Sequence, residues 1–194
     1  MDPTLFQKDR VIVLTSAYGV HNPMNRSRIS FKIPDRGDIV LMNLPSAGQY
    51  SALARLGNAL VRFLTVQRVG LSRSHALSEK PVILRIVAIP GDSVRMDGFV
   101  VYVKPGGQDH YLTEYEVSST MYDIDSIQGV EGWDEKMPLS GNFPPIELGP
   151  DEFFVAGDNR VASSDSRFFG PVSSNDFIGR VVARYWPLDR LSGL

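Results

Sequence analysis

The side chains that could do chemistry gather near the C-terminal end of this 194-residue chain, in the stretch 153–172. A strand-like run there enters Gly157, Asp158 and Asn159, where glycine permits unusual backbone angles and the Asp and Asn side chains can bond nearby amides. Residues 163–167 then place three hydroxyls, one acid and one base within five positions. Composition alone predicts a polar loop here, and such loops often border binding and catalytic sites.

Asp165 and Arg167 are two residues apart in this loop. In an extended chain they would point to the same side and form a charge-assisted hydrogen bond that holds the loop together. The nearby Ser164 and Ser166 lack the Gly-x-Ser-x-Gly context of a hydrolase nucleophile. The chain has no cysteine, and its three histidines are in separate segments without metal-ligand spacing. We therefore expect neither a metal nor a cofactor.

Four further motifs precede this loop in a fixed order. The stretch 85–94 reads Arg-Ile-Val-Ala-Ile-Pro-Gly-Asp-Ser-Val, and 36–40 reads Arg-Gly-Asp-Ile-Val. Ala-Tyr-Gly and a following proline occur within 17–23, and 1–5 reads Met-Asp-Pro-Thr-Leu. Taken together with the loop, these motifs resemble the signature boxes of bacterial type I signal peptidases, the membrane-bound serine endopeptidases that remove signal peptides from exported proteins.

The resemblance implies a serine–lysine dyad, in which a buried, neutral lysine accepts the proton of a serine hydroxyl. The family's nucleophile box is Ser-Met-x-Pro-Thr-Leu, so the serine would stand immediately before Met1, and an upstream transmembrane anchor is expected. The lysine position falls on Leu84, which cannot accept a proton. Ser163 matches the position whose hydroxyl orients the lysine. The chain as written is therefore predicted to be inactive.

Other lysines are poor substitutes for the missing base. Lys80 is four positions before Leu84, about 13 Å away in an extended chain. Shifting the alignment to reach it would break the ungapped 85–94 motif. Lys8, Lys32 and Lys104 belong to other motifs or to the edge of an insertion. We expect none of them to act as the base.

The resemblance also implies where a substrate lies. An extended peptide would contact Met1 and Pro3 on one side, and Val82 and Ile83 on a strand edge on the other, by β-augmentation. Five residues would have structural roles near the site: Gly157, Asp158, Asn159, Asp165 and Arg167. The implied partners are signal peptides of exported preproteins and the bacterial inner membrane, with the domain on its outer face.

Two hypotheses follow from these motifs. In the first, the chain is the catalytic domain of a signal peptidase I-like enzyme that begins beyond its anchor and serine, and Leu84 is a substitution or is bypassed by another base. In the second, it is a non-catalytic homologue that binds signal peptides or a membrane partner. The net charge of −2 gives no overall basic field, which argues against nucleic acid as a partner.

The elements that must position these residues are mostly strands. Short runs rich in β-branched and aromatic residues are separated by Gly, Pro, Asn or Asp, which predicts a mainly antiparallel β fold with one or two short helices. The predicted strands are 11–14, 38–42, 82–89, 99–103, 152–156 and 177–185. Residues 95–98 predict a hairpin turn, with Asp97 and Gly98 at positive φ.

Charge divides the chain unevenly. Residues 105–148 hold nine acidic residues and one basic residue, between proline- and glycine-rich boundaries. We interpret this stretch as an acidic inserted subdomain, with 1–104 and 149–194 forming the β core. Within the core, 44–80 is a basic insertion in which 51–71 has helical spacing. That helix is expected to pack on the sheet or, alternatively, to lie on an anionic bilayer.

Overall fold

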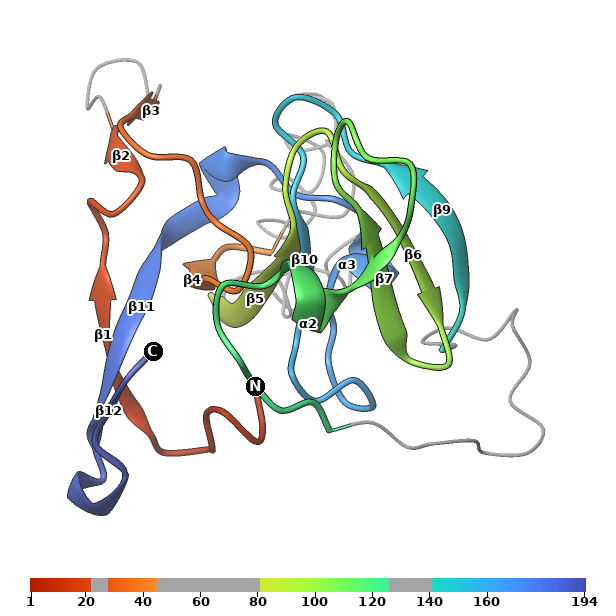
Figure 1. Ribbon diagram of the computed structural model, residues 1–194. Helices are drawn as coiled ribbons and strands as arrows, with labels where there is room; N and C mark the ends of the chain where they lie inside the picture. The colour runs from red at the N-terminus through yellow and green to blue at the C-terminus, as the bar shows by residue number, and fades with distance from the viewer. Residues whose placement is uncertain (22–27, 45–80, 126–140) are drawn as a thin grey trace, which may run out of the picture.

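The computed structural model describes residues 1–21, 28–44, 81–125 and 141–194, which form two antiparallel sheets and a small ribbon (Figure 1). The ribbon pairs β2 (Gly19–His21) with β3 (Arg28–Ser30). The predicted helix at 51–71 lies outside the described residues. None of the helices in the described ranges has the length and apolar character needed to cross a bilayer. The predicted mainly antiparallel fold is confirmed.

The first sheet carries five of the six predicted strands, all but 99–103. Its order is β1-β11-β4-β5-β10, and β12 pairs with the far end of β11. The strands are β1 (Arg10–Leu14), β4 (Ile39–Met42), β5 (Val82–Ala88), β10 (Phe154–Ala156), β11 (Phe177–Trp186) and β12 (Ser192–Gly193). In Figure 1, β1 and the long β11 form one side of the molecule, and β5 lies near its centre.

The second sheet has the order β8-β7-β6-β9. It consists of β6 (Ser93–Asp97), β7 (Val100–Lys104), β8 (Leu112–Thr113) and β9 (Phe143–Glu147). The sheet takes strands from both sides of the expected boundary at residue 104, because β6 pairs with β7 on one edge and with β9 on the other. The division into a core and an acidic subdomain stays a prediction.

The hairpin between β6 and β7 is present, but its turn is one residue later than expected. Asp97 pairs with Val100, so the two turn residues are Gly98 and Phe99. Their φ angles are 56° and 67°. Two positive φ angles match the right-handed twist of the flanking strands. Phe99 tolerates this conformation while its amide donates to the carbonyl of Gly141 at 2.9 Å.

The core lies on both faces of β5. Its residues from Leu84 to Ala88 are all buried, which is the pattern of a strand covered on two sides. One face packs in a cluster within the first sheet, whereas Val87 and Ala88 pack in a second cluster with β6, β7 and β10. Fully burying an aliphatic side chain such as that of Ile86 contributes about 1.5–3 kcal/mol. The strand that carries position 84 is therefore firmly held.

In the described ranges, helical structure is confined to short turns. The α-helices there are α2 (Glu114–Val117) and α3 (Ser166–Phe169), and the 3₁₀ turns are η2 (Ser174–Asp176) and η3 (Leu188–Arg190). A capping box at Thr113 and Glu116 starts α2. The helix α3 follows directly from the polar loop that the sequence singled out, so that loop is structured at its end.

Candidate functional site

Leu84 is buried in the middle of the molecule, with 4% of its surface exposed. Its side chain belongs to an apolar cluster, the Leu84 cluster, that also contains Tyr18, Val40, Met42, Ile86, Phe153, Val155, Val172 and Phe177. An amine placed at this position would lose its hydration, and burial of this kind lowers the pKa of a lysine. The surroundings therefore suit a neutral base, but the residue present has no group to titrate.

Gly157 brings Ser163 next to Leu84. A Cβ atom on Gly157 would lie 2.2 Å from the Ser163 Oγ and 3.7 Å from a Leu84 Cδ atom. Only glycine fits such a close approach. Its backbone is not at positive φ, so close packing, and not the unusual backbone angle we expected, explains this glycine. The structure brings Leu84, Gly157 and Ser163 together.

Asp165 and Arg167 form the expected ion pair, but not from an extended chain. Asp165 is the N-cap of α3, and two parallel hydrogen bonds of 2.8 and 2.9 Å join its carboxylate to the guanidinium of Arg167. The same carboxylate accepts the amide of Gly157 at 3.1 Å. A helix cap replaces the strand geometry because the acid satisfies amides at the start of α3. The pair thus fixes Gly157 as well as its own loop.

Asp158 has a buried partner that the motifs did not identify. Its carboxylate accepts two hydrogen bonds from Arg85, at 2.9 and 2.8 Å, and both side chains are almost fully buried. Thr4 donates its hydroxyl to the same carboxylate. Arg85 also donates to the carbonyl of Gly37 at 2.9 Å. The signal was available in the sequence, since a charged residue next to Leu84 in an otherwise apolar strand needs a buried partner.

Asn159 shapes the turn in the way the sequence suggests. Its side-chain oxygen accepts the amides of Val161 and Ala162 at 3.2 and 2.9 Å, which is an Asx-turn arrangement. We call residues 157–160 the site turn, because they connect Ser163 to the end of β10. The site turn is therefore fixed at both ends, by Asp165 on one side and by Asn159 on the other.

The N-terminal segment approaches the site turn through Thr4. The carbonyl of Met1 accepts the amide of Leu5 at 2.8 Å, which closes a turn around Pro3. Pro3, Thr4 and Arg85 line a cavity of about 350 Å³, whose other walls come from 120–123 and from the C-terminal strand region. Met1 and Pro3 are both half-buried. The structure thus places Pro3 at the same cavity as Arg85, the residue that follows Leu84.

Val82 and Ile83 lie on a part of β5 that has one strand neighbour among the described residues. They pair with Met42 and Leu41 of β4. On the opposite edge, β10 reaches only as far as Arg85, which pairs with Ala156. Both side chains are half-buried. With respect to the described residues, this edge has unpaired backbone groups that an added strand could bond.

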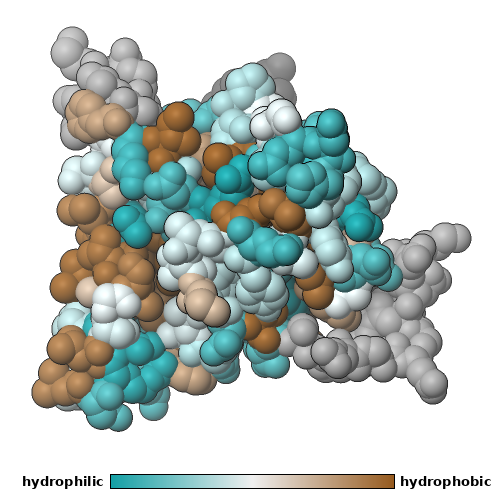
Figure 2. Space-filling model, in the orientation of Figure 1, coloured by the Kyte–Doolittle hydropathy of each residue, from teal (hydrophilic) through white to brown (hydrophobic). Residues whose placement is uncertain are grey.

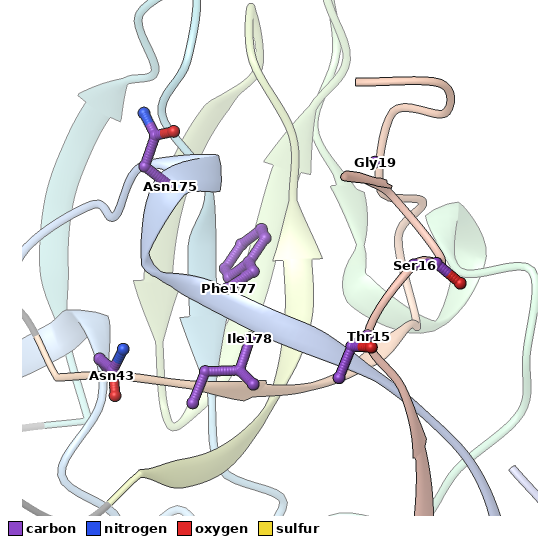
Figure 3. Close-up of a pocket in the computed structure, with 7 residues that line it drawn as sticks. All are labelled: Thr15, Ser16, Gly19, Asn43, Asn175, Phe177 and Ile178. Atoms are coloured by element: carbon purple, nitrogen blue, oxygen red, sulfur yellow. The ribbon is translucent and has the colours of Figure 1, made fainter. Parts of the chain in front are cut away.

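A second cavity, of about 400 Å³, has a different character (Figure 3). Side chains from the start of β11, from the end of β4 and from the β1–β2 loop line it: Thr15, Ser16, Asn43, Asn175, Phe177 and Ile178. None of them is ionisable, and none is a predicted site residue. Only Phe177 links this cavity to the Leu84 cluster.

None of the lysines that the structure describes is placed to replace the missing base. Lys8 is exposed, Lys32 forms an exposed ion pair with Asp35, and Lys104 lies 5.9 Å from the ring centre of Tyr111 in the second sheet. None of them belongs to the Leu84 cluster. Lys80 and His75 are outside the described residues, and His110 is exposed.

A family model described as "Signal peptidase, peptidase S26" matches residues 1–186. This chain belongs to the S26 signal peptidase family. Signal peptidase I of Leptolyngbya laminosa is 28% identical over 194 residues, covering all of this chain and 68% of the relative. Signal peptidase IB of Staphylococcus aureus is 30% identical over 114 residues, which are 58% of this chain and 57% of that protein. The S26 domain thus spans about two thirds of one relative and matches just over half of the other.

A solved signal peptidase I from Enterococcus faecalis also resembles the S26 domain. It is 21% identical, with a TM-score of 0.41, and the match covers 79% of this chain and all of that chain. The family assignment rests on the sequence matches. By family, this is an S26 serine endopeptidase domain. Leu84 departs from the pattern that the motifs resemble, because it occupies the position where a lysine is expected.

Proposed function

We propose that this S26 domain recognises signal peptides of exported preproteins along the edge of β5 and, with leucine at position 84, does not cleave them. The observation that carries the proposal is the environment of Leu84. It is buried in an apolar cluster beside Gly157 and Ser163. The site keeps the arrangement that would serve a lysine but holds a residue without a proton acceptor.

Recognition would use backbone and apolar contacts. An extended peptide added at Val82 and Ile83 would form ladder hydrogen bonds with the edge of β5 that no described strand pairs, and its alternate side chains would face the sheet. Such binding depends little on peptide sequence, because main-chain groups supply the hydrogen bonds. This suits a ligand class that shares an extended conformation and small side chains, as the family resemblance implies.

A catalytic function is the second candidate, and the intact scaffold around position 84 favours it. Gly157, Ser163 and the Asp165–Arg167 pair are all in place. In a protein with a serine immediately before Met1 and with Leu84→Lys, the serine would attack the scissile carbonyl while the lysine amine took the serine proton. Ser163 would accept or donate one hydrogen bond to that amine and so fix its direction. Met1 and Pro3 would lie on the substrate's path.

Membrane association is supported by an exposed apolar face. Large apolar side chains of β1, β11 and the turn after β11 are between 42% and 71% exposed: Ile12, Leu14, Tyr185, Trp186, Leu188 and Leu191. Figure 2 shows apolar side chains gathered on the side of the molecule where Figure 1 places β1 and β11. Patches of this kind mark surfaces that contact lipid or protein. We propose that this face lies against the outer leaflet side of the inner membrane.

Cleavage separates the two candidates. The measurement compares two proteins, both carrying a serine immediately before Met1, of which one also has Leu84→Lys. With a signal-peptide substrate, we expect no turnover with Leu84 and measurable cleavage with lysine at that position. Equal cleavage by both proteins would show that another base is used. A folded Leu84→Lys protein without any cleavage would contradict the assignment of position 84.

A further inference from the structure

The acidic stretch 105–148 contains one carboxylate whose burial sets it apart from the other described acidic residues there. Glu114, at the start of α2, is 1% exposed, whereas the other described acidic residues of this stretch are exposed. Its two oxygens accept the amide of Val101 at 3.3 Å and the hydroxyl of Tyr122 at 2.8 Å. A carboxylate is this deeply buried only when a charge partner is buried with it.

That partner is Arg160, the last residue of the site turn. Its guanidinium is fully buried and donates to the carboxylate of Glu114 through Nη2. The Nε and Nη1 atoms have no hydrogen-bond partner in the described part of the chain. Burial by itself lowers the pKa of Arg160, but the nearby acidic groups, Glu114 foremost among them, together outweigh it and the pKa is raised. Among the described residues, Glu114 is the one carboxylate hydrogen-bonded to this guanidinium.

The chain after Glu114 then runs along the site turn. The amide of Asp125 donates to the carbonyl of Asp158 at 2.9 Å, and the amide of Arg160 donates to the carbonyl of Asp125 at 2.8 Å. Tyr122, which precedes Asp125 in this segment, has its ring centre 3.9 Å from the guanidinium carbon of Arg85. A continuous path of contacts therefore leads from the acidic stretch to both neighbours of the site, Arg85 and the site turn.

We infer that Glu114 is a positioning residue: through Arg160 it holds the site turn, and with it Gly157 and Ser163, against residue 84. Through Glu114, the acidic stretch contributes to holding the site in place. The inference rests on the proposed function only in taking residue 84 as the centre of the site. It assigns no contact with substrate to Glu114.

The test is hydrogen exchange on the whole chain with Glu114→Gln. Three amides report on the site turn: those of Asp125, Gly157 and Arg160, each with a hydrogen bond inside the network. We expect their protection to fall by at least about tenfold, while amides in the β1–β11 ladder change little, because opening is local. Glu116→Gln is the matched control, since Glu116 is exposed, sits two residues away and bonds only to Thr113 among the described partners.

A second measurement introduces Leu84→Lys as a reporter, with and without Glu114→Gln, and determines the pKa of the lysine amine by NMR. Removing the negative charge of Glu114 would by itself lower that pKa. Admitting water through a displaced turn would raise it, and we expect a rise of about one unit. A rise can therefore come only from movement of the turn. If Glu114→Gln does not fold, Tyr122→Phe keeps every charge, removes one hydrogen bond to Glu114 and is examined in the same way.

Two results would overturn the inference. One is unchanged exchange of the three amides together with an amine pKa that stays or falls. The other is an equal loss of protection throughout both sheets, which would make Glu114 a general stabiliser. Neither readout involves a peptide, so a failure of signal-peptide binding or cleavage leaves this test intact, and the two proposals fail separately.

Discussion

At the scale of residues, the site depends on one contact that allows no side chain. Gly157 and Ser163 pack so closely that a methyl group on Gly157 would overlap the Ser163 side chain. The sequence indicated a special glycine here, but it suggested a backbone reason. The true reason, a contact between residues six positions apart, depends on how the loop folds back and cannot be derived from local spacing.

Replacing this glycine tests that contact. Gly157→Ala should lower the free energy of unfolding by about 1–3 kcal/mol, as overpacking of a filled site does. Adding Ser163→Gly removes the atoms that clash and should restore most of the loss. Gly193→Ala, at a position with open space around it, should change stability little. Denaturant unfolding measures all four proteins. A double variant as unstable as Gly157→Ala would contradict the explanation.

At the scale of elements, the sequence predicted strands well where at least one face is buried. The continuous apolar run of β5 and the alternation of β11 produced strands within one or two residues of the predicted limits. Short edge elements were not predicted. Examples are β8, with two residues, and β9, whose prolines argue against a strand. These elements exist because the second sheet provides partners, which is tertiary information.

The β1–β11 ladder carries the membrane prediction. Arg10 pairs with Trp186, and its guanidinium lies 6.0 Å from the Trp ring centre, so this face combines apolar groups with a cation. Binding to vesicles of anionic phospholipid should weaken by more than about tenfold in Trp186→Ser/Leu188→Ser, because each lost apolar group contributes about 1.5–3 kcal/mol when buried in lipid. Cosedimentation measures this. Phe168→Ser, in α3, serves as the control, and equal weakening by both would contradict the proposed face.

At the scale of the whole molecule, uneven charge predicted a separate acidic region, but the structure ties part of that region to the site. Most of its described acids face solvent, as a solvated surface would. Glu114 does not, and nothing in its sequence context distinguishes it from Glu116, two residues later. The partner that makes the difference, Arg160, is 46 positions away. Fold class, motif positions and the local Asp165–Arg167 pair could thus be predicted from sequence, whereas the distant pair of Glu114 and Arg160 could not.

We propose that the site binds signal peptides along β5 without cleaving them, and titration with a peptide is the decisive test. The ligand is a synthetic peptide containing a signal-peptide apolar region and cleavage site. The control is the same peptide methylated at alternate backbone nitrogens, which cannot complete a strand ladder. We predict saturable binding of the first, no cleavage, and binding at least about tenfold weaker for the second. Absence of saturable binding, or equal binding of both peptides, would contradict the account.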